Sequence, residues 1–482
     1  MSMTKKSRRR LFAVYGGLSV IGLILANAFP GLSEHAEVVP VNAWFIAPFA
    51  VLLLSIAVAP FIDKHWWEKN YDSVAYVLGF IVVVYYAIGV HNPGRMLHTA
   101  VEYVSFISLI GSLFVVAGGI HIGVRGRATP LENLGLLTLG ALLSNVLGTT
   151  GASMVLIRPY LRMNRFRFKP FHVVFFIFVV SNIGGALTPI GDPPLFLGYL
   201  KGIPFFWITG KATLIWAVCL GLVLAAFFAI DSWSFSRVSK DLRESAETGP
   251  DEARISGLHN VLFLAVIIAA VFVDDPAPRL LREVIMWGAA IASYVTTRAE
   301  VHEKNEFSFA PVREVAVLFV GIFATMVPAL DWLSLNARSI GIVTPGQFYW
   351  ATGTLSSVLD NAPTYLNFLS ASFGLHGANV DESVHMAAML GIRSLEASGY
   401  PNPLAEGMQV IGPTSWVYIQ AISLAAVFFG SCTYIGNGPN FMVKSIAEAS
   451  NLEVPSFFGY VARYAIPILL PIFTLIWFLF YR

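Results

Sequence analysis

Residues 188–196 read TPIGDPPLF, and residues 433–441 read TYIGNGPNF. Thr, Ile, Gly, Pro and Phe coincide in register between the two stretches, and each stretch lies inside a long apolar segment. Pro and Gly interrupt helices, and lipid cannot hydrogen-bond the backbone groups that a break sets free, so each break must face protein, water or an ion. The pair therefore predicts two interrupted helices in a membrane protein, over 171–200 and 409–446.

The composition of the whole chain also indicates a membrane protein. Hydrophobic residues make up 56% of the 482 positions and charged residues only 12%, whereas a soluble domain carries roughly 25% charged residues. A net charge of +2 argues against nucleic acid as a partner. Cys219 and Cys432 lie in apolar stretches and predict neither a disulfide framework nor a metal cluster. The chain carries no P-loop signature, which favours a carrier driven by ion gradients over an ATP-driven pump or an enzyme.

Apolar stretches long enough to cross a bilayer, which takes about 20 residues, recur along the chain. Uninterrupted ones lie near 11–30, 44–62, 73–92, 97–120, 211–230, 259–273, 281–297, 312–330 and 461–481. Together with the two interrupted helices they predict an all-α polytopic membrane protein with about eleven transmembrane helices. The first stretch reads as a signal anchor within residues 1–43, and a signal peptide cleaved at Ala26-Asn27-Ala28 is the alternative.

Two further apolar stretches, 131–157 and 345–372, read as re-entrant hairpins. The first is preceded by Arg125 and Arg127 and followed by five Lys or Arg residues between 158 and 169. Since Lys and Arg mark cytoplasmic loops, both of its ends lie on the cytoplasmic side, either as one hairpin or as two very short spans. The flanks of the second hairpin carry almost no positive charge, so it is expected to enter from the outside.

The two hairpins also match in sequence. One constant offset of 212 residues lays 102–152 on 314–364, and an odd number of spans between the hairpins inverts the second copy. Inverted repeats with interrupted helices in matching positions are typical of secondary transporters. The predicted repeats are 44–231 and 259–482, joined by a polar cytoplasmic linker over 232–258. The basic N-terminus is expected in the cytoplasm and the C-terminus outside.

Two of the interrupted segments each contain a single carboxylate. Asp192 stands alone in 174–200, and Asp360 stands alone in 345–372. A charge at bilayer depth costs roughly 2.5–3.5 kcal/mol, so each Asp is a functional-site hypothesis, with a helix cap as the alternative. Oxygen ligands suit Na⁺, and a desolvated carboxylate readily takes a proton. The sequence therefore predicts that Na⁺ (or Li⁺) and H⁺ compete for Asp192 and Asp360 as transported ions, with no cofactor.

Other residues of the hairpins and breaks complete the predicted site. The hydroxyl and amide side chains expected around the ion are Ser144, Asn145, Thr149, Thr150, Ser181, Asn182, Thr188, Asn361, Thr364, Thr433 and Asn437. The residues expected to shape the backbone of the turns are Gly148, Gly151, Gly191, Pro193, Pro363 and Gly436.

These motifs resemble those of a known group. Residues 355–363, LSSVLDNAP, resemble the Asp-Asn-x-Pro hairpin of NhaD-type sodium/proton antiporters, and 181–192, SNIGGALTPIGD, resemble the matching broken helix. The motif GDPP at 191–194 also resembles arsenite permeases. All belong to the ion transporter superfamily, with citrate and dicarboxylate carriers, and the resemblance covers roughly 44–482. It implies a protein of the cell (inner) membrane with eleven spans and two opposed hairpins, a homodimer, and a transport domain that moves elevator-fashion.

Two functions remain open at this point. The first is a Na⁺(Li⁺)/H⁺ antiporter in which cation and proton bind Asp192 and Asp360 in turn. The second is a cation-coupled carrier of citrate, a dicarboxylate or an arsenite-type anion. Two bare carboxylates, with no intramembrane Lys or Arg near the motifs, favour the antiporter.

Overall fold

The computed structural model is built almost entirely of helices, which confirms the all-α membrane class. It describes residues 38–125, 128–239, 252–273, 280–392 and 409–482. The signal anchor predicted within 1–43 therefore lies almost wholly outside the described residues. One small sheet interrupts the helical pattern, in which β1 (His121–Arg125) pairs antiparallel with β2 (Glu252–Ser256).

In this described part, seven helices are long and apolar enough to cross a membrane. They span Ala43–Pro60, Lys64–Gly89, Pro93–Gly118, Pro130–Met163, Trp207–Ser236, Ala310–Ile340 and Phe457–Phe480. Shorter apolar helices cover Pro170–Gly185, Asn260–Val271 and Trp416–Gly430. These lengths agree with a chain that crosses the bilayer many times.

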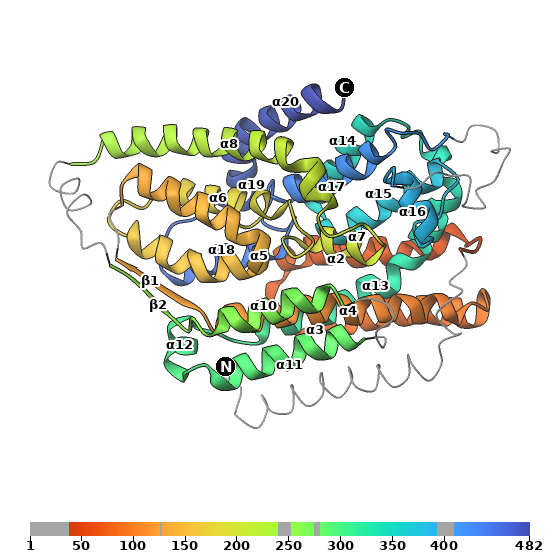
Figure 1. Ribbon diagram of the computed structural model, residues 1–482, viewed down its shortest axis with the longest axis horizontal. Helices are drawn as coiled ribbons and strands as arrows, with labels where there is room; N and C mark the ends of the chain where they lie inside the picture. Colours follow the sequence, from red (N-terminus) through yellow and green to blue (C-terminus); the bar gives the residue numbers. More distant parts are fainter. Residues whose placement is uncertain (1–37, 126–127, 240–251, 274–279, 393–408) are drawn as a thin grey trace.

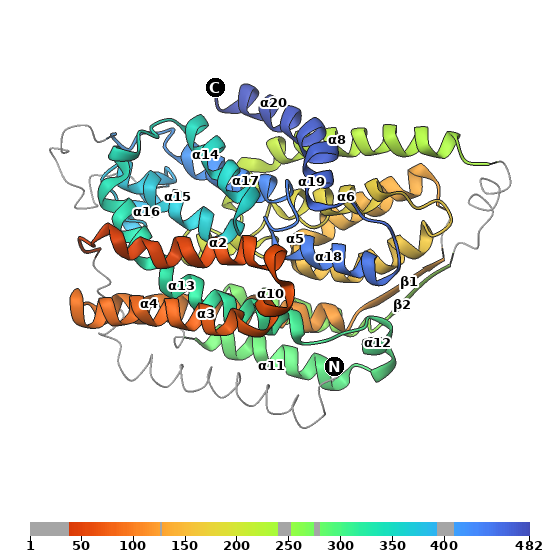
Figure 2. The ribbon, with the colours of Figure 1, turned by 180° about the vertical axis from the view of Figure 1, so that it is seen from behind.

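The helices form two layers (Figures 1 and 2). One layer contains α3 (Lys64–Val84), α4 (Pro93–Gly118), α10 (Asn260–Val271), α11 (Leu281–Thr296) and α13 (Ala310–Asn336), which pack on one another. The other contains the hairpins and interrupted helices, together with α8 (Trp207–Ser236) and α20 (Leu470–Phe480). The remaining α-helices of the described residues are α2 (Ala47–Ile62), α12 (Ala299–Lys304), α16 (Ser383–Met389) and α19 (Phe457–Tyr460). We call the first of the two layers the α4/α13 layer and the second the hairpin layer.

The first hairpin is formed by α5 (Pro130–Met163), which turns back on itself at Gly148. Gly148 has φ 74° and ψ 156°, a conformation that Gly adopts without steric penalty. Asn133 and Asn164, close to the two ends, donate side-chain amides to one another over 2.9 and 2.8 Å. The ends of the segment therefore meet, and the hairpin extends beyond the predicted limits of 131–157.

The second hairpin consists of α14 (Pro345–Val358) and α15 (Asn361–Leu375). Thr344 caps α14, and Asp360 caps α15 by accepting a hydrogen bond from the Ala362 amide over 3.0 Å. The turn thus falls at Leu359 and Asp360, and α15 ends three residues beyond the predicted limit of 372.

Both interrupted helices are present. The first consists of α6 (Pro170–Val179), a 3-10 turn (Ile183–Gly185) and α7 (Pro193–Leu200), and the second of α17 (Trp416–Gly430) and α18 (Gly438–Ala449). The apolar helix α6 is buried from Phe171 to Val179, which places the first break deep in the protein.

Two predicted segments differ from the helices and strands of the structure. The second interrupted helix begins at Trp416 rather than at 409, because Gly412 and Pro413 keep the preceding segment out of the helix. The predicted linker 232–258 is not a loop throughout, since α8 continues to Ser236 and Glu252–Ser256 forms a strand.

Candidate functional site

The Asp192 carboxylate is the centre of the candidate site. It is 1% exposed and accepts hydrogen bonds from Thr149 Oγ1 over 2.7 Å and from Asn437 Nδ2 over 2.8 Å. Its second oxygen accepts from Asn361 Nδ2 over 2.5 Å. Three donors from the two hairpins and the second break thus compensate a charge that has been removed from water. The structure brings these four predicted residues together, although they are up to 288 positions apart.

The tip of the first hairpin is joined to the first break by the backbone as well. The Thr149 amide donates to the Gly191 carbonyl over 2.8 Å, immediately after the turn at Gly148. Thr149 follows the turn at Gly148, and Gly191 precedes Asp192. The bond between them therefore holds the Thr149 hydroxyl next to the Asp192 carboxylate.

Gly191 and Gly436 occupy matching positions in the two breaks and make matching close contacts. A Cβ atom on Gly191 would lie 2.1 Å from the Gly185 carbonyl oxygen, and one on Gly436 would lie 2.6 Å from that of Gly430. No side chain fits at either distance, so both positions require Gly for packing rather than for dihedral freedom.

Amide side chains connect the two breaks behind Asp192. Asn182 Nδ2 donates to Asn440 Oδ1 over 2.7 Å, and Asn437 Nδ2 also lies 3.2 Å from Asn182 Oδ1 and from the Ser181 carbonyl. The Ser181 hydroxyl shares a 2.8 Å hydrogen bond with Ser153. Asn440 and Ser153 are not among the residues predicted from the sequence. Asn440 had a signal, because it is an amide inside the matched stretch 433–441.

Asp360 is half-buried and lies beside this network rather than in it. Its side chain accepts from the Ala362 amide, and Thr364 Oγ1 donates to its carbonyl over 2.8 Å. Within the described residues it makes no hydrogen bond to Asp192. Of the two predicted acids, Asp192 is therefore enclosed, whereas Asp360 is more accessible and caps α15.

The two polar atoms of the Asn361 side chain differ in their hydrogen bonding. Its Nδ2 donates to Asp192, whereas its Oδ1 is buried with no hydrogen-bond partner among the described residues. A buried acceptor without a donor costs roughly 1–3 kcal/mol, so it needs an explanation. Asn361 contacts Asp192 and directly follows Asp360 in the sequence. Its free oxygen is therefore suited to bind a cation or a donor of the substrate.

Most of the other predicted residues fasten the backbone of the breaks. Ser144 Oγ donates to the Val180 carbonyl, Asn145 Nδ2 to Gly184, Thr188 Oγ1 to Asn145, and Thr433 Oγ1 to Ser357. Pro193 and Pro363 lie in the first turns of α7 and α15. Gly151 packs on Ala117 of α4, and no side-chain hydrogen bond to Thr150 is found in the described part of the chain.

The base of the first hairpin is held by residues that the sequence did not single out. Asp231 of α8 is buried and accepts from Arg167 through both oxygens, with Nη2 at 2.8 Å. Asn133 Nδ2 donates to the same carboxylate over 3.0 Å. Asp231 thereby fixes both ends of the hairpin to α8, and none of these groups contacts Asp192.

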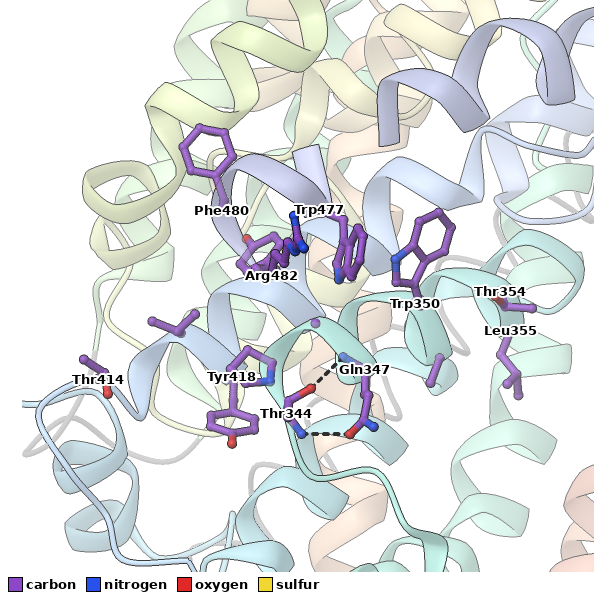
Figure 3. Close-up of a pocket in the computed structure, with 15 residues that line it drawn as sticks. Thr344, Gln347, Trp350, Thr354, Leu355, Thr414, Tyr418, Trp477, Phe480 and Arg482 are labelled. Atoms are coloured by element: carbon purple, nitrogen blue, oxygen red, sulfur yellow. Dashed lines mark hydrogen bonds between the residues drawn. The ribbon is translucent and has the colours of Figure 1, made fainter. Parts of the chain in front are cut away.

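A groove lies apart from Asp192, along the outer side of the second hairpin. It has a volume of about 990 Å³ and is lined by α14, α17 and the end of the chain, including Trp350, Trp477 and Arg482. Figure 3 shows Thr344 and Gln347 hydrogen-bonded to one another at its edge. None of its lining residues belongs to the Asp192 network.

A comparison with known protein families assigns the chain to one of them. Residues 38–481 match the family model CitMHS_2, described as "Putative citrate transport". The chain belongs to this family. It is a membrane transporter of the citrate-transporter group, and the match does not single out the NhaD-type antiporters that its motifs resemble.

Its relatives have transporter names as well. The uncharacterized transporter Mb2703 of Mycobacterium bovis is 23% identical over 442 residues, which cover 86% of this chain and 95% of the relative. The uncharacterized transporter Rv2684 of Mycobacterium tuberculosis gives the same values. The uncharacterized transporter Rv2685 of that species is 22% identical over 387 residues, covering 74% and 81%.

Proposed function

We propose that this protein is a cation-coupled secondary transporter of citrate-class carboxylate anions. The observation that carries the proposal is the Asp192 carboxylate, buried where both hairpins and both breaks meet. A polycarboxylate anion is repelled by Asp192 and Asp360 unless these groups bind a cation or a proton. Binding of Na⁺, Li⁺ or H⁺ therefore precedes binding of the anion, which is the requirement for coupled transport.

Helix N-termini supply the attraction for the anion. The helices α7, α15 and α18 begin directly after Asp192, Asp360 and Asn437. Each N-terminus carries partial positive charge from the helix dipole, which favours carboxylate groups. This supports an anion bound beside, and dependent on, a cation held by the two acids.

The membrane arrangement belongs to the same proposal. Residues 44–231 and 259–482 are inverted repeats whose hairpins enter from opposite sides of the cell (inner) membrane, with the N-terminus cytoplasmic and the C-terminus outside. The protein acts as a homodimer, and the hairpin layer moves against the α4/α13 layer. The matching contacts of Gly191 and Gly436 in the two breaks support the repeat.

A Na⁺(Li⁺)/H⁺ antiporter is the second candidate. Across the described residues, no Lys or Arg side chain hydrogen-bonds to Asp192 or Asp360. A site of carboxylate, hydroxyl and amide oxygens suits a bare cation, which exchanges with protons at the same carboxylates.

Purified protein in proteoliposomes separates the two candidates. Labelled citrate is supplied outside with an inward Na⁺ gradient, an inward proton gradient or neither, and a pH-sensitive dye reports proton movement without citrate. The proposal predicts gradient-driven citrate accumulation that Asp192→Asn abolishes and that Asp360→Asn reduces at low cation concentration. Asp63→Asn, at an exposed cap of α3, is the matched control and should transport normally. If Na⁺ or Li⁺ alone dissipates the pH gradient and citrate does not accumulate, the antiporter is correct.

A further inference from the structure

The groove along the outer side of the second hairpin lies where three helix ends meet. It contacts the start of α14 at Pro345, the start of α17 at Val417 and the end of α20 at Phe480. The last of these ends the helical segment Phe457–Phe480, which is long and apolar enough to cross a membrane. The end of a membrane-crossing helix lies close to the membrane surface, so this part of the groove lies at the boundary between lipid and water.

From this boundary the groove runs toward the apolar interior of the membrane. Figure 1 shows the end of the chain beside α14, and the lining continues along α14 from Gln347 to Leu355. Roughly two helical turns, or about 12 Å, separate these two residues. Leu355 on α14 and Leu479 on α20 are both exposed, as expected for positions that face lipid. One end of the groove therefore lies at the membrane surface and the other at the depth of the acyl chains.

The chemistry of the lining changes in the same direction. Figure 3 shows Arg482, Trp477 and Trp350 following one another along the groove, with Leu355 beyond them. The two indole rings lie with their centroids 6.4 Å apart. Trp is enriched at the membrane–water boundary, because its ring is apolar and its N–H is polar. A charged group, a pair of indoles and an aliphatic side chain thus succeed one another, as the headgroup, the glycerol and the acyl chains do in a phospholipid.

Arg482 gives the polar end of the groove its charge. It is the one charged side chain in the lining, which contains no Asp or Glu. Its guanidinium carbon lies 4.9 Å from the centre of the Phe478 ring, and no Asp or Glu in the described part of the chain forms an ion pair with it. A guanidinium keeps its charge and binds phosphate through two parallel hydrogen bonds. The dipoles of α14 and α17, which both start at this end, favour an anion as well.

We propose that the groove binds an anionic phospholipid, with its phosphate at Arg482 and an acyl chain along α14 toward Leu355. The helix α14 is the first arm of the hairpin that carries Asp360 at its turn, so the lipid contacts this hairpin on the side away from Asp192. The site does not depend on which substrate the protein transports.

Native mass spectrometry of the purified, delipidated chain tests the site with two lipids of identical acyl chains. Phosphatidylglycerol is anionic and phosphatidylcholine is zwitterionic. At one site the Kd for phosphatidylglycerol should be about fivefold lower, as expected for one Arg near an anionic headgroup. Glycerol phosphate, which has the headgroup chemistry without the acyl chains, should not displace the bound lipid.

Replacing the guanidinium tests the charged end. Arg482→Gln should bind the two lipids equally. Arg237→Gln is the matched control, because Arg237 also follows the last turn of an apolar helix, α8, and lies 3.7 Å over the Trp233 ring, but it does not line the groove. This control should keep the preference for phosphatidylglycerol.

Filling the groove tests its apolar end. Thr354→Phe places a ring in the groove from an exposed position and should abolish the binding of both lipids at this site. Leu142→Phe, at the corresponding exposed position of the first hairpin, is the control and should bind them like the natural chain.

Three results would overturn the proposal, whatever the transport assays show. The first is equal affinity of the natural chain for the two lipids. The second is an unchanged preference for phosphatidylglycerol in Arg482→Gln. The third is a lipid-free dimer that Thr354→Phe dissociates, because a second copy of the chain would then occupy the groove.

Discussion

Asn437 Nδ2 donates to Asp192 Oδ1 over 2.8 Å, so the residues that start α18 and α7 contact one another. They occupy the same place in the two matched stretches, 433–441 and 188–196. One is an amide and the other an acid, and this difference leaves a single charge where two equivalent helix starts meet. The contact explains how Asp192 is stabilised in a buried position and why it still has the charge to bind a cation.

Replacing the amide by a second acid tests this relationship. In Asn437→Asp two carboxylates would lie within hydrogen-bond distance, and like charges so close cannot both ionise. Citrate uptake at pH 7.5 should fall at least tenfold and recover in part at pH 5.5, where one of the acids is protonated. Asn437→Ala removes the donor without adding charge, so it should lower uptake by a similar factor at both pH values. Equal pH profiles of the two variants would contradict the account.

Asp360 allows its two roles to be separated. Asp360→Asn keeps a good helix cap for α15 and removes only the charge, so thermal stability should be unchanged while the KM for the coupling cation rises about tenfold. Asp360→Ala also removes the cap and should cost about 1 kcal/mol of stability in addition. Cation titrations of uptake, combined with unfolding temperatures, measure both effects. A normal cation KM in Asp360→Asn would show that Asp360 acts only as a cap.

Two glycines of the second break, Gly436 and Gly438, differ in how closely other atoms approach them. A Cβ on Gly436 would lie 2.6 Å from the Gly430 carbonyl oxygen and 2.8 Å from that of Ser356. Gly436→Ala should therefore destabilise the protein by about 1–3 kcal/mol through overpacking. Gly438→Ala, two residues later, meets no atom within 4 Å and should be neutral or slightly stabilising. The unfolding temperatures of the two variants in one detergent check this, and equal values would argue against the tight contact.

The Arg167–Asp231 ion pair at the base of the first hairpin predicts that the stability effects of mutating its two residues are coupled. Arg167→Leu leaves the buried Asp231 carboxylate without its cation and should cost about 3–5 kcal/mol. The double variant Arg167→Leu with Asp231→Leu removes both charges and should lose less than Arg167→Leu alone. Arg165→Leu, at an exposed position, is the control and should be close to neutral. A double variant as unstable as the sum of the two single variants would show that the pair is not coupled.

Local patterns predicted much of the fold and of the site. Pro, Gly and a lone Asp inside apolar segments indicated both breaks and both hairpins, because lipid tolerates such sequences only where the protein satisfies the backbone. They also gave Thr149, Asn361 and Asn437 as candidates, and these are the three donors to Asp192.

The ion pairs between distant segments could not be predicted in this way. Asp231 lies near the end of an ordinary apolar helix, and its partner Arg167 was read as part of a basic cytoplasmic loop. Arg95 and Asp331 are separated by 236 residues, so only the packing of α4 on α13 brings them together. The strand Glu252–Ser256 was missed because its five residues pair with a strand that is more than 120 positions away.

The measurement that tests the central claim most directly is the dependence of citrate binding on the cation. Titration calorimetry on purified protein gives the Kd for citrate across a series of Na⁺ concentrations and pH values, for the natural chain and for Asp192→Asn. The account predicts that Na⁺ or protons lower the Kd of the natural chain at least tenfold, because they neutralise Asp192 before the anion binds, and that the variant loses this dependence. A citrate Kd in the natural chain that is independent of both Na⁺ and pH would contradict it.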